Sequence, residues 1–190
     1  MNFLVGREEM EAVFGAEELV TLDDRALAGI AHEPTRAFLR EVGLPDRIGW
    51  FEADQSLCDG ALRVGGESWA RFAADYPDCP FDMSSWTNLG GIGFDSLVID
   101  TSTGQVYCVP DGQNPHRLNS SIDSLAFFLH ALEAERPHYD PDASEEGATE
   151  SEESAERLLA LMKRTDPAAV EDPESYWHSV LEQVADALDC

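Results

Sequence analysis

The residues SLVIDTSTGQVYCV, which run from Ser96 to Val109, have the pattern of a β-hairpin. β-Branched and aromatic side chains occupy both arms, and the four residues 101–104 between the arms end in glycine. Tight turns that join antiparallel strands have this composition. We therefore expect residues 96–100 and 105–109 to pair as antiparallel strands.

The sequence on both sides of this hairpin predicts helices. Ser121 is a suitable N-cap for a helix that runs from Ile122 to about Glu135, where apolar residues recur at helical spacing. Earlier in the chain, Pro34 suits the first turn of a short helix, and Gly43 suits its C-terminal end. Two more helices are expected near the C-terminus, from about Glu152 to Lys163 and after Asp172-Pro173-Glu174.

Further short strands are expected at residues 18–22, 48–53, 61–64 and 86–91. Helices on either side of a run of strands predict the α+β class with a mainly antiparallel sheet. Residues 140–156 contain eight acidic residues and no basic one, which is typical of a solvated linker. We expect an α+β core over residues 1–136, an acidic flexible linker over 137–154, and C-terminal helices over 155–190 that pack on the same domain.

The charge of the chain restricts the kinds of partner that it can bind. Twelve Lys and Arg residues stand against 38 Asp and Glu residues among 190, which gives a net charge of -26. A surface this negative repels nucleic acid and anionic membranes and favours a basic partner. The first ten residues lack the pattern of a signal peptide, so we expect a cytoplasmic protein. The spacing of the four cysteines favours free buried thiols over disulfides.

No motif in the sequence predicts catalysis, a cofactor or a metal. Gly90-Gly91-Ile92-Gly93 precedes a strand rather than a helix, so it is better explained by a turn than by a phosphate-binding loop. His130 and Glu133 are one possible metal half-site, but no spacing suggests a third ligand. We therefore expect no catalytic, cofactor-binding or metal-binding residues, and the sequence leaves the oligomeric state open.

Two tryptophans with acidic neighbours are candidates for binding a basic partner. Trp50 stands near Glu52 and Asp54, and Trp86 stands in the same region of the chain as Asp95. An aromatic anchor among carboxylates suits contact with a basic protein, although a tryptophan is more often a core residue. The predicted partner-binding residues are Trp50, Glu52, Asp54, Trp86, Asp95 and Asp111.

Several segments match a known family in their order along the chain. They are Pro34-Thr35, Phe38-Leu39 and Gly43-Leu44-Pro45; then Leu89-Gly90, Leu97 to Asp100, and Gly104 with Val106; then Asn119-Ser120-Ser121-Ile122 with Leu125 and Phe128; and finally Tyr176-Trp177 with Val180-Leu181. This ordered set resembles the SUKH superfamily, and in particular its fourth family of immunity proteins.

The resemblance implies an α+β fold in which helices pack around a small, mainly antiparallel twisted sheet. It also implies a non-catalytic cytoplasmic protein that binds and neutralises a bacterial polymorphic toxin. It implies that the toxin is often a nuclease or a nucleic-acid deaminase with a basic cleft, which an acidic partner would approach quickly and block. The matching residues carry over the fold and no toxin-binding residue. Two other interpretations stay open: a small-molecule-binding or hydrolytic enzyme that uses a carboxylate pair and His116, and an acidic scaffold or DNA mimic that regulates a basic protein.

Overall fold

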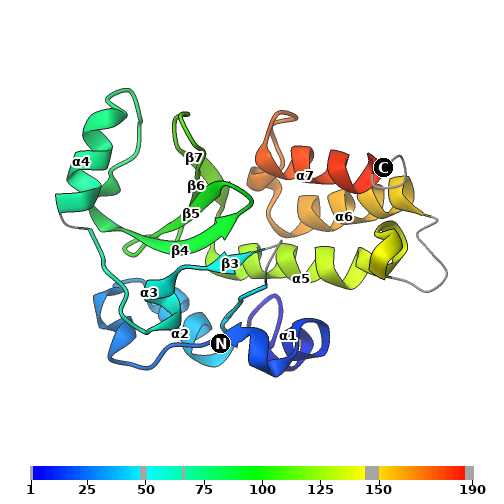
Figure 1. Ribbon diagram of the computed structural model, residues 1–190, viewed down its shortest axis with the longest axis horizontal. Helices are drawn as coiled ribbons and strands as arrows, with labels where there is room; N and C mark the ends of the chain where they lie inside the picture. The colour runs from blue at the N-terminus through cyan, green and yellow to red at the C-terminus, as the bar shows by residue number, and fades with distance from the viewer. Residues whose placement is uncertain (1, 48–50, 66, 144–149, 187–190) are drawn as a thin grey trace.

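The computed structural model describes residues 2–47, 51–65, 67–143 and 150–186, and within these ranges it contains seven α-helices and two antiparallel sheets (Figure 1). The α-helices are α1 (Arg7–Phe14), α2 (Glu33–Glu41), α3 (Gln55–Cys58), α4 (Glu67–Asp75), α5 (Ile122–Tyr139), α6 (Ser151–Thr165) and α7 (Tyr176–Ala185). The strands are β1 (Leu19–Val20), β2 (Leu44–Pro45), β3 (Glu52–Ala53), β4 (Trp86–Ile92), β5 (Asp95–Asp100), β6 (Val106–Val109) and β7 (His116–Asn119). Short 3₁₀ helices are η1 (Ala16–Glu18), η2 (Ala26–Gly29), η3 (Met83–Ser85), η4 (Pro141–Ala143) and η5 (Pro167–Ala169). The α+β prediction is confirmed.

The predicted hairpin is confirmed as β5 and β6, which pair with Leu97 opposite Cys108 and Ile99 opposite Val106. Asp100 closes the turn, because its carboxylate accepts hydrogen bonds from the Ser102 backbone N–H at 2.8 Å and the Ser85 hydroxyl at 2.7 Å. Gly104 has φ +79°, and a Cβ at this position would stand 2.3 Å from the His32 ring, so the turn requires glycine. The hairpin turn is therefore fixed by both hydrogen bonds and close packing.

The larger sheet has the strand order β3-β4-β5-β6-β7, and all its neighbours are antiparallel. The register of β4 against β5 shifts between Asn88 and Gly90, which is a bulge in β4. A Cβ on Gly90 would lie 2.2 Å from the backbone oxygen of Glu52 in β3. Glycine thus lets the short edge strand β3 approach the bulged part of β4.

The two faces of this sheet pack against different helices, which lie on opposite sides of it in Figure 1. Leu97, Ile99 and Cys108 point into the main core, which also contains Phe128 of α5 and Trp177 of α7. On the other face, α4 covers a smaller cluster of aromatic residues. Its buried members are Met83, Trp86, Val98, Tyr107 and Val109, and Trp69, Phe72, Ala73, Tyr76, Cys79 and Phe81 pack against it. The sheet is therefore buried on both faces.

A buried carboxylate joins the C-terminal helices to the centre of the fold. Asp166, between α6 and η5, is 4% exposed. It accepts hydrogen bonds from the Ser120 backbone N–H at 2.7 Å, the Ser124 hydroxyl at 2.8 Å and the Asn119 side-chain amide at 3.3 Å. The Asn119 side-chain oxygen in turn accepts a hydrogen bond from Trp177 Nε1 at 3.2 Å. The end of β7, the start of α5 and the helix α7 are thus tied together.

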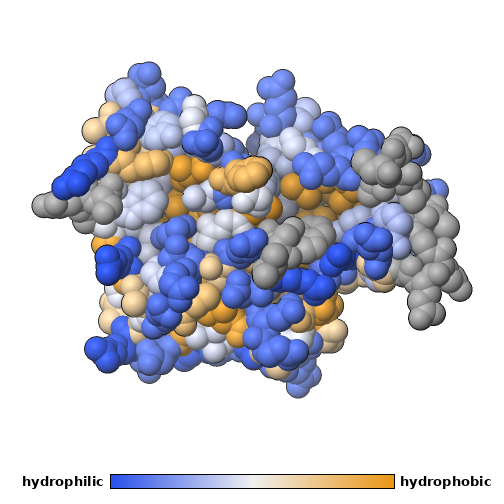
Figure 2. Space-filling model, in the orientation of Figure 1, coloured by the Kyte–Doolittle hydropathy of each residue, from blue (hydrophilic) through white to orange (hydrophobic). Residues whose placement is uncertain are grey.

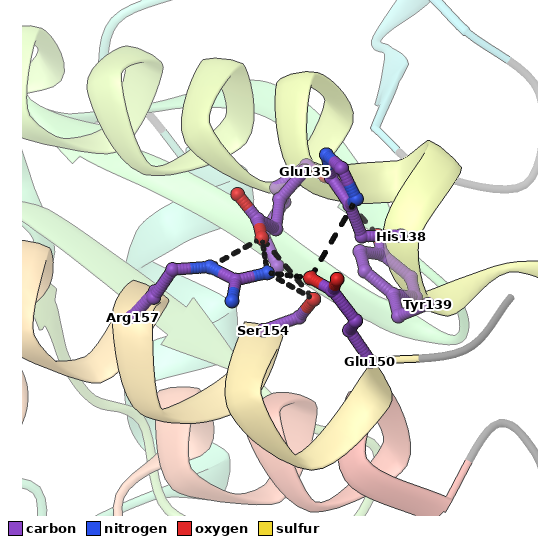
Figure 3. A network of polar contacts seen from close by, with 7 residues as sticks. Glu135, His138, Tyr139, Glu150, Ser154 and Arg157 are labelled. Carbon is purple, nitrogen blue, oxygen red and sulfur yellow. Dashed lines mark hydrogen bonds and ion pairs between the residues drawn. The ribbon is translucent and has the colours of Figure 1, made fainter.

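A second polar network joins the end of α5 to the start of α6 (Figure 3). Arg157 donates from Nε to Glu135 at 2.8 Å and pairs with Glu150 at 3.2 Å, and the Ser154 hydroxyl donates to Glu135 at 3.1 Å. The Glu150 backbone N–H donates to the His138 carbonyl oxygen. These contacts hold the two helices side by side.

The helices extend further into residues 137–154 than the composition predicts. Residues 137–139 form the last turn of α5, and residues 151–154 form the first turn of α6, with Ser151 and Ser154 buried. Acidic residues in a first helical turn are stabilised by the helix dipole, so Glu152 and Glu153 suit this position. Within the expected linker, only residues 144–149 lie outside the described residues.

Some local predictions were wrong or incomplete. Residues 61–64 were predicted as a strand but form none. The Thr87 hydroxyl donates to the Arg63 carbonyl oxygen, and the Gly65 N–H donates to the Trp86 carbonyl oxygen. This segment therefore lies along β4 without forming a ladder of β-sheet hydrogen bonds. Helix α1 and strand β7 were not predicted. Helix α7 starts at Tyr176 with Ser175 as its N-cap, because Asp172 forms a separate turn in which its side chain accepts from the Glu174 N–H.

The cysteines that the structure describes are unpaired. Cys108 is buried, Cys79 is half-buried and Cys58 is exposed, so the prediction of buried thiols holds fully only for Cys108. Burial raises the pKa of Cys108 to about 12, with the nearby Asp95 acting in the same direction. Cys108 is therefore a protonated core residue at neutral pH.

We predict that Asp166→Ala lowers the free energy of unfolding by about 3 kcal/mol, because it leaves several buried donors without an acceptor. Asp166→Asn should cost less, since an amide oxygen still accepts. Urea denaturation followed by tryptophan fluorescence measures both variants. The matched control is Asp172→Ala, an aspartate in an exposed turn, and it should cost under about 1 kcal/mol. Equal losses for Asp166→Ala and Asp172→Ala would contradict the assignment.

We also predict that Asp100 makes stability depend on pH. Burial acts to raise its pKa, but the hydrogen bonds from Ser102, Ser85 and Thr103 outweigh burial and lower the pKa below the ordinary value of 3.8. A carboxyl group whose pKa is lower in the folded than in the unfolded chain stabilises the fold at pH values above its unfolded pKa. This contribution is lost as the pH falls through the native pKa. Asp100→Asn keeps an acceptor oxygen without the charge, so it should be less stable than the wild type at pH 7 by about 1 kcal/mol. The difference in unfolding free energy between the two proteins should shrink between pH 4 and pH 2.5 in urea titrations at low protein concentration. A difference that stays constant over this range would refute the role assigned to Asp100.

Candidate functional site

A groove with a volume of about 670 Å³ lies between the β4–β5 hairpin turn and α7. The turn Ile92–Asp95 forms one wall, and the α7 residues Tyr176, Ser179 and Val180 form the opposite wall. His116, at the start of β7, lies between the two. We call this feature the Phe94 groove, after the aromatic residue at its edge. Figure 2 shows hydrophobic atoms gathered over the centre of one face of the molecule, with hydrophilic atoms around them.

The hairpin turn places Phe94 in solvent. Ile92 and Asp95 form the last pair between β4 and β5, so Gly93 and Phe94 are the two central residues of the turn. Gly93 has φ +60°, and glycine at the first central position is typical of a type II′ hairpin turn. Phe94 is 100% exposed, whereas the only other exposed large hydrophobic residue among those described, Leu4, is 47% exposed. The tip therefore presents an uncovered aromatic ring beside the groove.

Helix α7 forms a stable second wall because its other face is buried. Trp177 is 1% exposed and packs its ring against Phe128 of α5, with ring centroids 5.1 Å apart. Tyr176 and Val180 stand four residues apart and so share the face of the helix that lines the groove. The side chains that face the groove are thus held by a helix anchored in the core.

The described residues that line the groove include two acids, Asp95 and Glu174, and neither lysine nor arginine. Burial lowers the pKa of His116 below its ordinary value, while a hydrogen bond with the Asn114 backbone and the charge of Asp95 act in the opposite direction. His116 is therefore neutral at pH 7. Burial likewise raises the pKa of Tyr176, so its phenol stays protonated. The groove is consequently acidic, with no cationic side chain among its described residues.

Two of the sequence-predicted partner-binding residues lie at this groove. Asp95 lines it, and Asp111 is exposed in the β6–β7 loop between Pro110 and Gln113, which also line it. The structure thus brings Asp95 and the loop of Asp111 to one place, although their partner-binding role stays a prediction.

The other predicted residues lie elsewhere. Glu52 is exposed on the edge strand β3, opposite Gly91. Asp54 caps α3, accepting from the Ser56 backbone N–H at 2.8 Å and from the Asn88 side-chain amide at 2.9 Å. Asp54 therefore has a structural role in the fold. Trp50 lies outside the described residues.

The structure places Trp86 in the core, so it does not offer a surface anchor. The ring is 0% exposed and stacks on Tyr107 with centroids 4.7 Å apart, while Trp69 of α4 meets it edge-on at 5.7 Å. The prediction that Trp86 contacts a partner is therefore corrected. The acidic residues near Trp86 in the sequence did not predict an exposed ring, because the alternation of side chains along β4 points the indole towards α4.

The described residues were also compared with common catalytic and metal-binding arrangements. No group of three His, Cys, Asp or Glu side chains in this part of the chain is placed to hold a metal ion. Glu133, the proposed half-site partner of His130, instead pairs with Arg47 at 3.0 Å. No hydrogen bond joins Ser179 to His116 within the described ranges, as a serine nucleophile with a histidine base would require.

Sequence reasoning missed Phe94, Glu174 and Tyr176 as surface residues of one site. Glycine followed by phenylalanine between two predicted strands was the available signal for Phe94. Nothing in the sequence signals that α7 approaches this turn, because about eighty residues separate the two. No helix in the described parts of the chain combines the length and the apolar composition needed to cross a bilayer.

A model of the SUKH-4 immunity protein family matches residues 5–183. The chain belongs to the SUKH-4 immunity protein family. The resemblance found in the sequence is confirmed, and the match includes both walls of the Phe94 groove up to Gln183. Neither a curated protein nor a solved structure matches the chain. Membership of SUKH-4 implies a non-enzymatic role in which the partner is a cognate toxin.

We predict that His116 of this SUKH-4 protein titrates below pH 6.5. Replacing Asp95 by Asn removes a negative charge that favours the protonated ring, so Asp95→Asn should lower the His116 pKa further. Carbon–proton NMR spectra recorded from pH 4.8 to 8 measure both values, and the loss of one resonance in His116→Gln assigns the signal. The pKa of His130, which lies near Glu9, should not change in Asp95→Asn. A His116 pKa above 6.5, or one that rises in Asp95→Asn, would show that burial does not control this ring.

Proposed function

We propose that this SUKH-4 protein binds and neutralises a cognate polymorphic toxin in the cytoplasm, and that the toxin has a basic surface, as a nuclease or a nucleic-acid deaminase does. The observation that carries this proposal is the family match over residues 5–183. Neutralisation is by binding, without catalysis by the immunity protein.

The distribution of charge supports a basic partner. Residues 1–132, which include the sheet, contain 21 acids and 8 bases, and residues 133–190 contain 17 acids and 4 bases. Several arginines of the described residues are already in ion pairs with acids of the same chain, among them Arg7, Arg36, Arg40, Arg47, Arg136 and Arg157. The net negative charge on both parts would attract a protein whose positively charged cleft is built to hold a polyanion. The acidic surface would then compete with the polyanion for that cleft.

An enzymatic function is the second candidate, because His116 and Asp95 line the Phe94 groove together with Ser179. A neutral histidine beside a carboxylate has the right chemistry for a general base. The missing hydrogen bond between Ser179 and His116 within the described ranges weighs against a nucleophile of this kind. One substitution distinguishes the two candidate functions. His116→Ala removes the base that an enzyme would need but leaves the acidic side chains of the groove in place.

We predict that co-expression with the toxin encoded by the neighbouring gene restores growth to cells that the toxin alone kills. The two purified proteins should form a complex in size-exclusion chromatography. His116→Ala should still form the complex and still protect cells, because protection comes from binding and the substitution leaves both acids of the groove in place. Absence of both rescue and complex would defeat the immunity proposal, and loss of rescue in His116→Ala with complex formation intact would favour the enzyme.

We further predict that electrostatic attraction speeds the association of the two proteins. The association rate constant should fall at least about tenfold between 50 and 500 mM NaCl, because salt screens charges that lie more than a Debye length apart. The dissociation rate constant should change much less. Stopped-flow tryptophan fluorescence measures both constants, and an association rate indifferent to salt would mean that the toxin surface is not basic.

A further inference from the structure

The tip of the β4–β5 hairpin is unusual because it exposes an aromatic ring that contributes nothing to the core. Phe94 is 100% exposed, and apart from Gly93 and its two neighbours in the chain no described residue has an atom within 4 Å of the position that a Cβ on Gly93 would take. The tip therefore projects from the surface without support from neighbouring elements. Aromatic residues in such positions are enriched among the side chains that dominate protein–protein binding.

The groove beside Phe94 has the shape and charge to receive a cationic side chain. It is about 670 Å³ in volume, and the phenol ring of Tyr176 lies on the wall opposite the hairpin. Asp95 and Glu174 supply negative charge from the two sides, while no lysine or arginine is among its described lining residues. A guanidinium or ammonium group gains from carboxylates and from the face of an aromatic ring together.

We propose that the Phe94 groove is the toxin-binding surface: Phe94 enters an apolar depression of the toxin, and an arginine or lysine side chain of the toxin enters the groove between the hairpin and α7. This inference rests on the proposed function and adds the location and chemistry of the contact. The toxin surface therefore has basic residues around an apolar depression.

Charge complementarity favours a basic toxin over other occupants of the groove. A second copy of this acidic chain would bring like charges together, because Asp95, Glu174 and the loop of Asp111 would meet their own equivalents or other acidic surface. The C-terminal residues 187–190 contribute an acid and no base, so the groove would not attract them. A basic protein satisfies both the acidic groove and the exposed ring.

The test measures binding of the toxin from the neighbouring gene, inactivated in its active site, by biolayer interferometry. Phe94→Ala and Glu174→Lys should each weaken binding at least about tenfold. Phe94→Ala should act mainly on the dissociation rate, and Glu174→Lys should also slow association. Matched controls are Leu4→Ala for an exposed apolar residue and Glu17→Lys for an exposed acid on the α1 side of the molecule, and both should bind within about twofold of the wild type. Thermal denaturation checks that every variant is folded.

A second measurement locates the contact directly. Phe94 is replaced by the photo-crosslinking amino acid p-benzoylphenylalanine, and Leu4 is replaced in a control protein. Irradiation of the mixture with toxin should crosslink the variant at position 94 and not the variant at position 4. Mass spectrometry should place the crosslink on a toxin peptide close to arginine or lysine residues.

The outcomes separate this inference from the proposed function. If the wild type does not bind the toxin, the proposed function fails. If the wild type binds and both Phe94→Ala and Glu174→Lys bind equally well, the toxin uses another surface and only the inference fails. If light scattering shows that the wild type is a dimer and Phe94→Ala is a monomer, the groove joins two copies of this chain and the inference is overturned.

Discussion

The hydrogen bonds to the buried carboxylate of Asp166 determine how the two halves of the chain fit together. This side chain is 4% exposed and accepts from the end of β7 and from the first turn of α5, while it belongs to the connection after α6. Trp177 reaches the same point through Asn119. The position of α7 relative to the sheet, and hence the width of the groove, depends on these bonds. A carboxylate that is buried in this way holds its place because moving it would leave several donors unsatisfied.

The acidic residues of this protein have two different relationships to the fold. Asp54, Asp100 and Asp166 accept hydrogen bonds from backbone and side-chain donors, and these bonds contribute to the stability of the fold. The acids around the groove add to a net charge of -26, which repels itself and works against a compact chain. A surface of this kind lowers its electrostatic energy when a positively charged protein docks on it. The same property that weakens the free protein would therefore strengthen a complex with a protein of this kind.

Local signals in the sequence predicted the elements that carry their own caps and turns. The hairpin around Asp100, helix α2 with Pro34 and Gly43, and helix α5 with Ser121 are of this type. Strand β7 was missed because its polar sequence has no hydrophobic alternation and gains its pairing from β6. Asp95 was predicted to bind a partner because it is an acid in the same region of the sequence as Trp86, whereas Phe94 was not predicted. No pattern within a strand pair distinguishes a phenylalanine in solvent from one in a core, because the difference depends on segments that are distant along the chain.

The hairpin tip also bears on how such a protein changes over generations. Because Phe94 packs against no core residue, its replacement leaves the sheet, the bulge at Gly90 and the helices as they are. The side chain at this position can therefore change without loss of the fold, while the glycine beside it preserves the turn. Selection on recognition and selection on folding act on separate residues. A protein engineer can therefore vary the tip of this hairpin without redesigning the domain.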